Sequence, residues 1–258
     1  MKKSTIKSLI LFVLLPVVVV SMPFALSALA TDSTAFDWYF KTNDTHTRPE
    51  VLPEADFICE FENVITMGAD KKEIYLTFDA GFDNGNMATI LDTLKEKNVP
   101  AAFFVDGNFV KNEPELSKRI CAEGHILGNH SLNHADMSSL LDFEQYKEQV
   151  EGWNEVVKSV GATPSKYFRF PCGKFSKRAL EYNEQLGLKT VFWSFAYYDW
   201  DVNKQPDADA AMNKILSRTH NGCVMLLHSV SKTNADILPN VIDRLKLEGY
   251  TFKSLNEI

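Results

Sequence analysis

Polar residues at several points along the chain have the types and spacing that hydrolytic chemistry needs. Asp79 follows the apolar, β-branched run 74–78, at the point where a buried strand would end. A carboxylate there is costly to bury unless it has a partner or a task. His130 and His134 are four residues apart, and on one helical turn both imidazoles could face the same metal ion. Either feature alone is more typical of a turn, a helix cap or a surface pair.

The second half of the chain adds a cation, an acid and a further histidine. Arg169 interrupts an apolar segment, and a buried arginine needs an anion. It would either form a structural salt bridge or hold Asp79 as an oriented carboxylate. His228 ends the apolar run 224–227, where it would be a satisfied core histidine or a catalytic one. Asp199 follows another apolar run and could hold the ring of a catalytic histidine.

Two more residues are candidates for contacts with a substrate. Trp200 directly follows Asp199, and its ring would serve either as core or as a platform for a sugar. Pro171 and Gly173 flank Cys172 and would shape a loop whose backbone N–H groups, including that of Cys172, face the site.

The elements that must position these residues alternate along the chain. Apolar strands are expected at 74–79, 101–105, 125–128, 167–170, 189–195, 223–227 and 250–252, and amphipathic helices at 84–97, 114–123, 143–160, 176–186, 206–218 and 234–247. This alternation predicts an α/β protein with a parallel sheet. We expect a distorted (β/α) barrel of about seven strands, with a doubly wound open sheet as the alternative. In such a barrel the active site forms at the carboxyl ends of the strands, where the candidate residues fall.

The first thirty residues have the composition of an export signal. Lys2, Lys3 and Lys7 precede an uncharged apolar run, and residues 28–30 (Ala-Leu-Ala) form a small-x-small cleavage pattern. An uncleaved anchor is the alternative, because the run is long enough to span a bilayer. In either case we expect the folded part to work outside the cytoplasm. Without the leader lysines the net charge of −7 becomes −10, which argues against a nucleic-acid partner.

We therefore divide the chain into three parts. Residues 1–30 are a signal peptide or membrane anchor, 31–70 an N-terminal extension, and 71–258 the catalytic domain. The extension would either pack on the domain as an extended arm or form a partly disordered lead-in. The cysteines contain no CxxC pair, so we expect free, mostly buried thiols, with one disulfide as the alternative.

Taken in order, the motifs resemble those of the polysaccharide deacetylase (NodB-homology) family of metal-dependent carbohydrate de-N-acetylases. The matching segments are Thr77-Phe78-Asp79, His130-Ser131-x-x-His134, Arg169-x-Pro171-x-Gly173, Asp199-Trp200 and Leu226-x-His228. The resemblance runs from about residue 73 to the C-terminus, and several motifs in the right order are far more specific than any one of them. The family has a distorted (β/α) barrel, in agreement with the alternation above.

The resemblance implies a role for each matching residue. Asp79 would be the general base and His228 the general acid. Arg169 would orient Asp79, Asp199 would tune His228, and the backbone N–H near Cys172 would help to hold the oxyanion. These roles suit the hydrolysis of an amide, which needs an activated water, a polarised carbonyl and a proton for the departing nitrogen.

The resemblance also implies a metal site, and here the chain departs from the family. His130 and His134 would be ligands of a divalent ion, Zn²⁺ or similar, whereas the third ligand in most of the family is an aspartate that follows the general base. Ala80 stands at that position and cannot bind a metal, so the ion would be held weakly. Asp83 is a candidate substitute, and a weak, substrate-assisted or absent metal site is the alternative.

Three segments, residues 77–85, 193–197 and 228–235, resemble one branch of the family, the muramic-δ-lactam-forming de-N-acetylases of endospore formers. That branch also lacks the second aspartate. It removes acetate from N-acetylmuramic acid in spore-cortex peptidoglycan, and the freed amine then closes a lactam.

We therefore expect an exported, monomeric deacetylase whose partner is a peptidoglycan glycan strand and whose only membrane contact is the N-terminal segment. It would be secreted or anchored on the outer side of the cytoplasmic membrane, the forespore intermembrane space being one such location. The alternatives are a deacetylase of N-acetylglucosamine in peptidoglycan or chitin-like chains, and a non-catalytic protein that only binds glycan.

Overall fold

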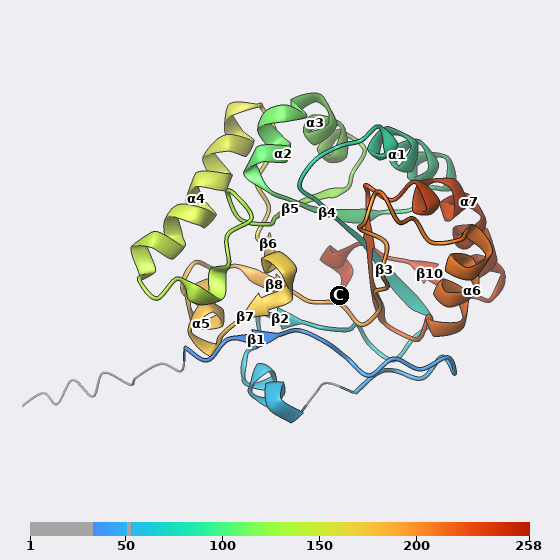
Figure 1. The fold of residues 1–258 in the computed structure, drawn as a ribbon, viewed down its shortest axis with the longest axis horizontal. Coiled ribbons are helices and arrows are strands. Elements are labelled where there is room, and N and C mark those ends of the chain that lie inside the picture. The colour runs from blue at the N-terminus through green and yellow to red at the C-terminus, as the bar shows by residue number, and fades with distance from the viewer. Residues whose placement is uncertain (1–32, 51–52) are drawn as a thin grey trace, which may run out of the picture. The chain divides into compact units, whose positions relative to one another are not determined.

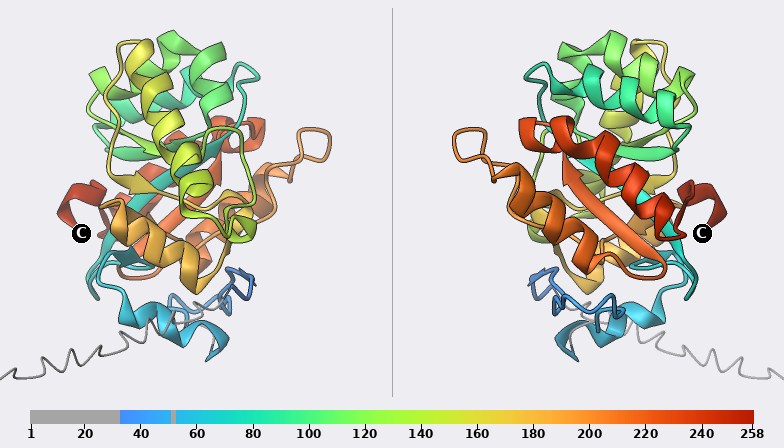
Figure 2. Two further views of the ribbon diagram at one scale, coloured as in Figure 1. Left: turned by 90° about the vertical axis from the view of Figure 1, so that its left-hand side faces the viewer. Right: turned by 90° about the vertical axis from the view of Figure 1, so that its right-hand side faces the viewer.

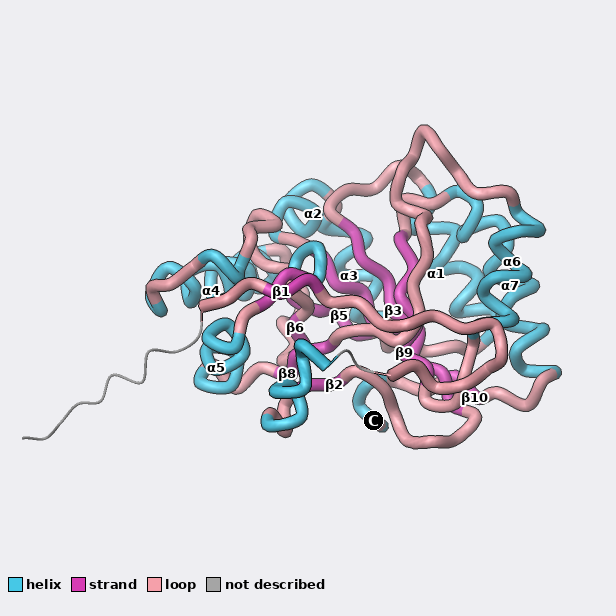
Figure 3. Tube along the Cα trace, turned by 60° about the horizontal axis from the view of Figure 1, so that its bottom comes forward, coloured by secondary structure: helices cyan, strands magenta, loops and turns pink. Residues whose placement is uncertain are grey.

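A curled parallel sheet forms the centre of the computed structural model, which describes residues 33–50 and 53–258. Its strands are β2 (Val64–Ile65), β3 (Glu73–Ala80), β4 (Ala101–Val105), β5 (Ile126–Asn129), β6 (Tyr167–Phe168), β8 (Lys189–Val191), β9 (Cys223–His228) and β10 (Thr251–Phe252). They lie side by side in the order β10-β3-β4-β5-β6-β8-β2. Strand β9 pairs with β3 (Figure 3). A parallel bridge between Phe195 and Met225 brings the segment after β8 into contact with β9, so the sheet curls back on itself. The predicted distorted barrel is confirmed.

Helices surround this sheet (Figure 1). They are α1 (Asn86–Lys97), α2 (Gly107–Asn112), α3 (Pro114–Ala122), α4 (Phe143–Ser159), α5 (Lys177–Gln185), α6 (Ala208–Arg218) and α7 (Lys232–Leu247). Side chains of Asp142, Ser176, Asp207 and Ser231 accept backbone N–H groups at the starts of α4 to α7, which explains where these helices begin. The sequence analysis missed α2, a short helix capped by Asp106, whose Oδ1 accepts the N–H of Phe109 at 2.7 Å.

The core forms where the sequence predicts it. The apolar face of the predicted amphipathic helix α4 is buried, with Tyr146 and Trp153 fully enclosed. All four cysteines are free. Cys223 is buried, but Cys59 and Cys172 are exposed, so the expectation of mostly buried thiols is wrong for these two.

The N-terminal extension packs on the domain as an extended arm. Its strand β1 (Phe36–Asp37) pairs antiparallel with β7 (Lys174–Phe175), and β2 joins the large sheet beside β8. Trp38 stacks on Phe192 with ring centroids 4.5 Å apart, and its Nε1 donates to the carbonyl of Trp193 at 2.9 Å. Its backbone N–H donates to the carbonyl of Gly173 at 2.8 Å. The arm therefore contacts the loop around Cys172 through the hydrogen bond from Trp38 to Gly173.

The leader, residues 1–30, lies outside the described residues. Among residues 33–50 and 53–258, none of the helices combines the length and the apolar character that crossing a bilayer requires.

We expect the variant Trp38→Ala to lower the free energy of unfolding by about 3–5 kcal/mol, because it removes a buried indole and its hydrogen bond. The neighbouring variant Tyr39→Ala is the control, since Tyr39 is 53% exposed and its loss should cost less than about 0.5 kcal/mol. Urea unfolding measures both. Equal midpoints for the two variants would show that the arm does not stabilise the domain.

Candidate active site

A cavity of about 470 Å³ opens beside the carboxyl ends of β3, β5 and β9. Its wall brings together Asp79, His130, His134, Cys172, Trp200 and His228. The remaining predicted residues, Arg169 and Asp199, are fully buried and bond directly to members of the wall. The loop before α6, which carries Trp200, projects from the body of the domain (Figure 2). The structure thus gathers every predicted site residue at one place.

The predicted base and acid lie on adjacent strands. In the parallel pairing of β3 with β9, Asp79 stands opposite His228, and both side chains line the cavity. They are far apart in the chain, so this proximity is produced by the sheet alone. A proton acceptor and a proton donor can therefore act on one substrate.

Asp79 is held as a carboxylate by a buried arginine. Arg169 Nη1 donates to Asp79 Oδ1 at 2.7 Å, and its Nε and Nη2 donate to the carbonyls of Val191 and Phe192 at 3.0 and 3.3 Å. Burial would raise the pKa of Asp79, but the charges of Arg169 and His228 and the hydrogen bond from Arg169 outweigh it and bring the pKa below its ordinary value. Asp79 is therefore ready to accept a proton at neutral pH.

The side chain of His228 contacts a negatively charged residue, Asp199. Asp199 Oδ1 accepts His228 Nδ1–H at 2.7 Å, and Asp199 Oδ2 accepts the backbone N–H of His228 at 2.9 Å. Burial would lower the pKa of His228, but the hydrogen bond and charge of Asp199, with the charge of Asp79, raise the pKa above its ordinary value. Since Nδ1 faces Asp199, Nε2 is left for the substrate. The ring of Trp200 lies edge-on to this imidazole, 5.6 Å between centroids.

His130 and His134 meet in a loop and not on a helical turn, which corrects the sequence prediction. The loop turns sharply because Ser131 and His134 have left-handed backbones, with φ of 67° and 59°. The two ring centroids are 5.0 Å apart. His130 Nδ1 donates to the carbonyl of Arg169 at 2.9 Å, so Nε2 carries the lone pair, 3.8 Å from Asp79 Oδ2. Burial lowers the pKa of His130 to about 4, which keeps the ring neutral.

These two imidazoles are suited to a metal, but a third ligand from the protein is missing. Ala80, next to Asp79, lines the cavity, and its methyl group cannot bind a metal. Asp83 does not replace it: its Oδ1 accepts the N–H of Met87 at 3.2 Å at the start of α1. Within the described part of the chain, no three His, Cys, Asp or Glu side chains are placed to hold an ion together. The residues present do not form a three-ligand metal site.

The loop at Cys172 has a shape that only small residues allow. Cys172 and Gly173 have φ of 56° and 68°. A Cβ on Gly173 would lie 2.7 Å from Cη2 of Trp193, so a larger residue would clash as well as strain the backbone. The role of the Cys172 N–H in holding an oxyanion stays a prediction.

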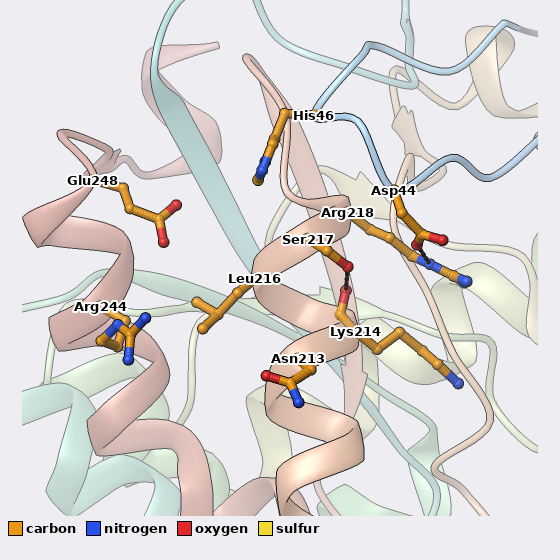
Figure 4. Close-up of a pocket in the computed structure, with 9 residues that line it drawn as sticks. All are labelled: Asp44, His46, Asn213, Lys214, Leu216, Ser217, Arg218, Arg244 and Glu248. Atoms are coloured by element: carbon orange, nitrogen blue, oxygen red, sulfur yellow. Dashed lines mark hydrogen bonds and ion pairs between the residues drawn. The ribbon is translucent and has the colours of Figure 1, made fainter.

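A second cavity, of about 520 Å³, lies between the arm and helices α6 and α7 (Figure 4). Asp44 there pairs with Arg218 at 2.6 Å, and His46 bonds the carbonyl of Thr219 at 2.8 Å. These two contacts attach the arm, and none of the predicted site residues lines this cavity, so the first cavity is the candidate site.

Comparison with known proteins agrees with this site. Residues 66–191 match the family model described as "Polysaccharide deacetylase". The peptidoglycan-N-acetylmuramic acid deacetylase PdaA of Bacillus subtilis is 39% identical over 91% of this chain and 89% of its own. The chain belongs to the polysaccharide deacetylase family. As a member it is a hydrolase that cleaves the C–N bond of an acetylated sugar amine.

Two further relatives extend the comparison. The structure of B. subtilis PdaA, described as a family 4 carbohydrate esterase, matches with a TM-score of 0.83 and 38% identity, over 88% of this chain and 97% of that one. The peptidoglycan-N-acetylglucosamine deacetylase PgdA of Listeria monocytogenes is 34% identical over 72% of this chain and 39% of its own.

The sequence analysis assigned no role to two residues behind the site, Tyr197 and Asn234. Asn234 Nδ2 donates to Asp199 Oδ2 at 2.6 Å, and the hydroxyl of Tyr197 bonds Asn234 Oδ1. Both residues belong to the segments that resemble the lactam-forming branch, and this resemblance was the feature of the sequence that could have pointed to them. Their contacts depend on folding and could not be inferred from spacing.

We expect the variant Asp199→Asn to shift the high-pH limb of activity. His228 must be protonated to act as an acid, so activity falls as pH rises through its pKa. Removing the Asp199 charge lowers that pKa, and the limb should move down by about 1–3 pH units. The low-pH limb, set by Asp79, should stay in place. A pH profile of kcat checks this, and an unmoved upper limb would separate Asp199 from the acid.

We expect the variant Ala80→Asp to bind Zn²⁺ more tightly than the wild type, because it adds a carboxylate beside His130 and His134. Isothermal titration with the metal alone measures the change, independently of turnover. Ala80→Asn, equal in size but uncharged, is the matched control. Equal affinity in all three proteins would show that position 80 does not face the metal.

Proposed function

We propose that this protein is an exported peptidoglycan de-N-acetylase that removes acetate from N-acetylmuramic acid residues. The observation that carries the proposal is the placement of Asp79 opposite His228 in one cavity, each with charges behind it that favour its working protonation state. The similarity to PdaA over 91% of the chain supports the choice of sugar.

The reaction follows from these two groups. Asp79 takes a proton from a water molecule, and the resulting hydroxide attacks the acetyl carbonyl carbon. The tetrahedral intermediate then collapses as the C–N bond breaks, and His228 Nε2 gives its proton to the departing nitrogen. The products are acetate and a free amine. Asp79 then releases its proton to solvent, and His228 takes up a proton from solvent.

Deacetylases of this family are generally metal-dependent, and His130 and His134 are the residues that would hold an ion here. A divalent ion such as Zn²⁺ would supply Lewis acidity. Among the described residues these two imidazoles are the candidate ligands, and the proton transfers require only Asp79 and His228.

Aromatic side chains at the rim support a glycan substrate. Trp200 and Phe82 are each about half exposed and border the cavity from different loops. Flat, exposed rings next to a polar site are suited to packing against sugar faces. We include in the proposal the later closure of a muramic δ-lactam in spore cortex, on the strength of the three branch-like segments. Action outside the cytoplasmic membrane, with the forespore intermembrane space as one location, is supported by the composition of residues 1–30.

The second candidate is an N-acetylglucosamine deacetylase. It is favoured by the similarity to PgdA over 72% of this chain. A protein that only binds glycan is disfavoured, because binding alone does not need an oriented base and an oriented acid in one cavity.

We expect acetate release from muramic acid residues of peptidoglycan strands whose stem peptides have been removed. Acetate is measured enzymatically, and the sites of deacetylation by mass spectrometry, with and without chelator. Asp79→Asn is the inactive control, and it should release at least about 100-fold less acetate while remaining folded. Release from glucosamine residues only would establish the second candidate. No release with any divalent metal would leave binding as the function.

A further inference from the structure

We propose that Tyr197 and Asn234 form a positioning pair that orients Asp199 and, through it, the general acid His228. The inference rests on the proposed function, because it assigns a task to residues that support the same acid. Neither residue of the pair belongs to the wall of the cavity. Their effect on catalysis would pass through Asp199.

Asn234 connects the carboxylate to the strand end that carries the acid. It lies in the first turn of α7, where its own N–H is accepted by Ser231 Oγ at 3.2 Å, and its side chain is buried. Its Nδ2 donates to Asp199 Oδ2 at 2.6 Å and to the carbonyl of His228 at 3.3 Å. One amide group thus fixes both the carboxylate and the backbone of the residue that it serves.

Tyr197 supports the amide orientation of Asn234 by donating to its oxygen. Its hydroxyl bonds Asn234 Oδ1, and burial together with the charge of Asp199 raises the pKa of Tyr197 far above the physiological range. The hydroxyl therefore stays protonated and acts as a donor. Asp199 Oδ2 and the carbonyl of His228 can only accept, so the NH₂ group must face them and Oδ1 must face Tyr197, whose hydroxyl donates to it. The reverse orientation would place an oxygen against a carboxylate.

The pair completes the hydrogen bonding of a carboxylate that water does not reach. Asp199 is fully buried. Its Oδ1 accepts His228 Nδ1–H, and its Oδ2 accepts the His228 N–H and Asn234 Nδ2. Without Asn234, Oδ2 would keep a single donor and the carboxylate could rotate. The other charged groups that act on His228 are Asp79 and Arg169, which belong to the base and do not restrain the imidazole ring.

The test compares Asn234→Ala and Tyr197→Phe with the wild type by steady-state kinetics. We expect kcat to fall by about 10- to 100-fold for Asn234→Ala and by less for Tyr197→Phe. KM should stay unchanged in both, because neither residue touches the substrate cavity. A second measurement is the proton NMR signal of His228 Nδ1–H, which should be sharp in the wild type and broadened or lost in both variants, since the bond to Asp199 is no longer fixed.

A second tyrosine–asparagine pair provides a matched control. Tyr146 donates to Asn183 Oδ1 at 2.7 Å, and both residues are buried away from the cavity. Tyr146→Phe removes an equivalent hydroxyl, and Asn240→Ala removes an exposed amide from α7 itself. Both controls should leave kcat and the His228 signal unchanged.

The outcomes separate this inference from the proposed function. If Asn234→Ala and Tyr197→Phe lower the unfolding midpoint but retain the wild-type kcat and NMR signal, the pair is structural and the inference is wrong. If the wild type releases no acetate from any glycan, the proposed function fails. The NMR comparison still decides in that case whether the pair orients Asp199 and His228.

Discussion

The buried ion pair between Arg169 and Asp79 is the constraint on which the rest of the site depends. Arg169 is fully enclosed, and its guanidinium lies 4.2 Å from the ring centroid of Phe104, so it has no access to water. Burying both charges is expensive, and such a pair is often no more stabilising than apolar residues of the same volume. Its value lies in position: the carbonyls of Val191 and Phe192 fix the guanidinium from the β8 side, and the guanidinium fixes Asp79 Oδ1. Oδ2 is then the oxygen left for water.

The sequence was sufficient for the features that follow from pattern. The alternation of apolar runs and amphipathic segments predicted the parallel sheet and most of the helices. Each candidate at a strand end lies at the one cavity, because parallel strands share their carboxyl ends. Features set by local backbone geometry were not accessible in this way. The His130–His134 pair was expected on a helix, but the left-handed residues Ser131 and His134 make a loop that brings the rings together. The short helix α2 was missed as well, and the side chain that caps its start is that of one residue, Asp106.

Contacts between segments that are far apart in the chain also could not be predicted from the sequence. Nothing in residues 31–70 has a period that marks them as part of a sheet, yet β2 extends the sheet beside β8 and β1 pairs with β7. Trp38 reaches the Cys172 loop through the carbonyl of Gly173, so the arm and the catalytic domain share one hydrogen-bonded unit. Similarity to PdaA extends over 91% of the chain, compared with 72% for PgdA.

The base Asp79 and the acid His228 differ in the charge of the side chains that contact them. Arg169 and neutral His130 stand behind Asp79, whereas Asp199, with Asn234 donating to it, stands behind His228. Opposite neighbours move the pKa of Asp79 below and the pKa of His228 above their ordinary values, which favours an ionised base and a protonated acid. This arrangement does not involve position 80. An alanine at position 80 therefore leaves the contacts that support Asp79 and His228 in place.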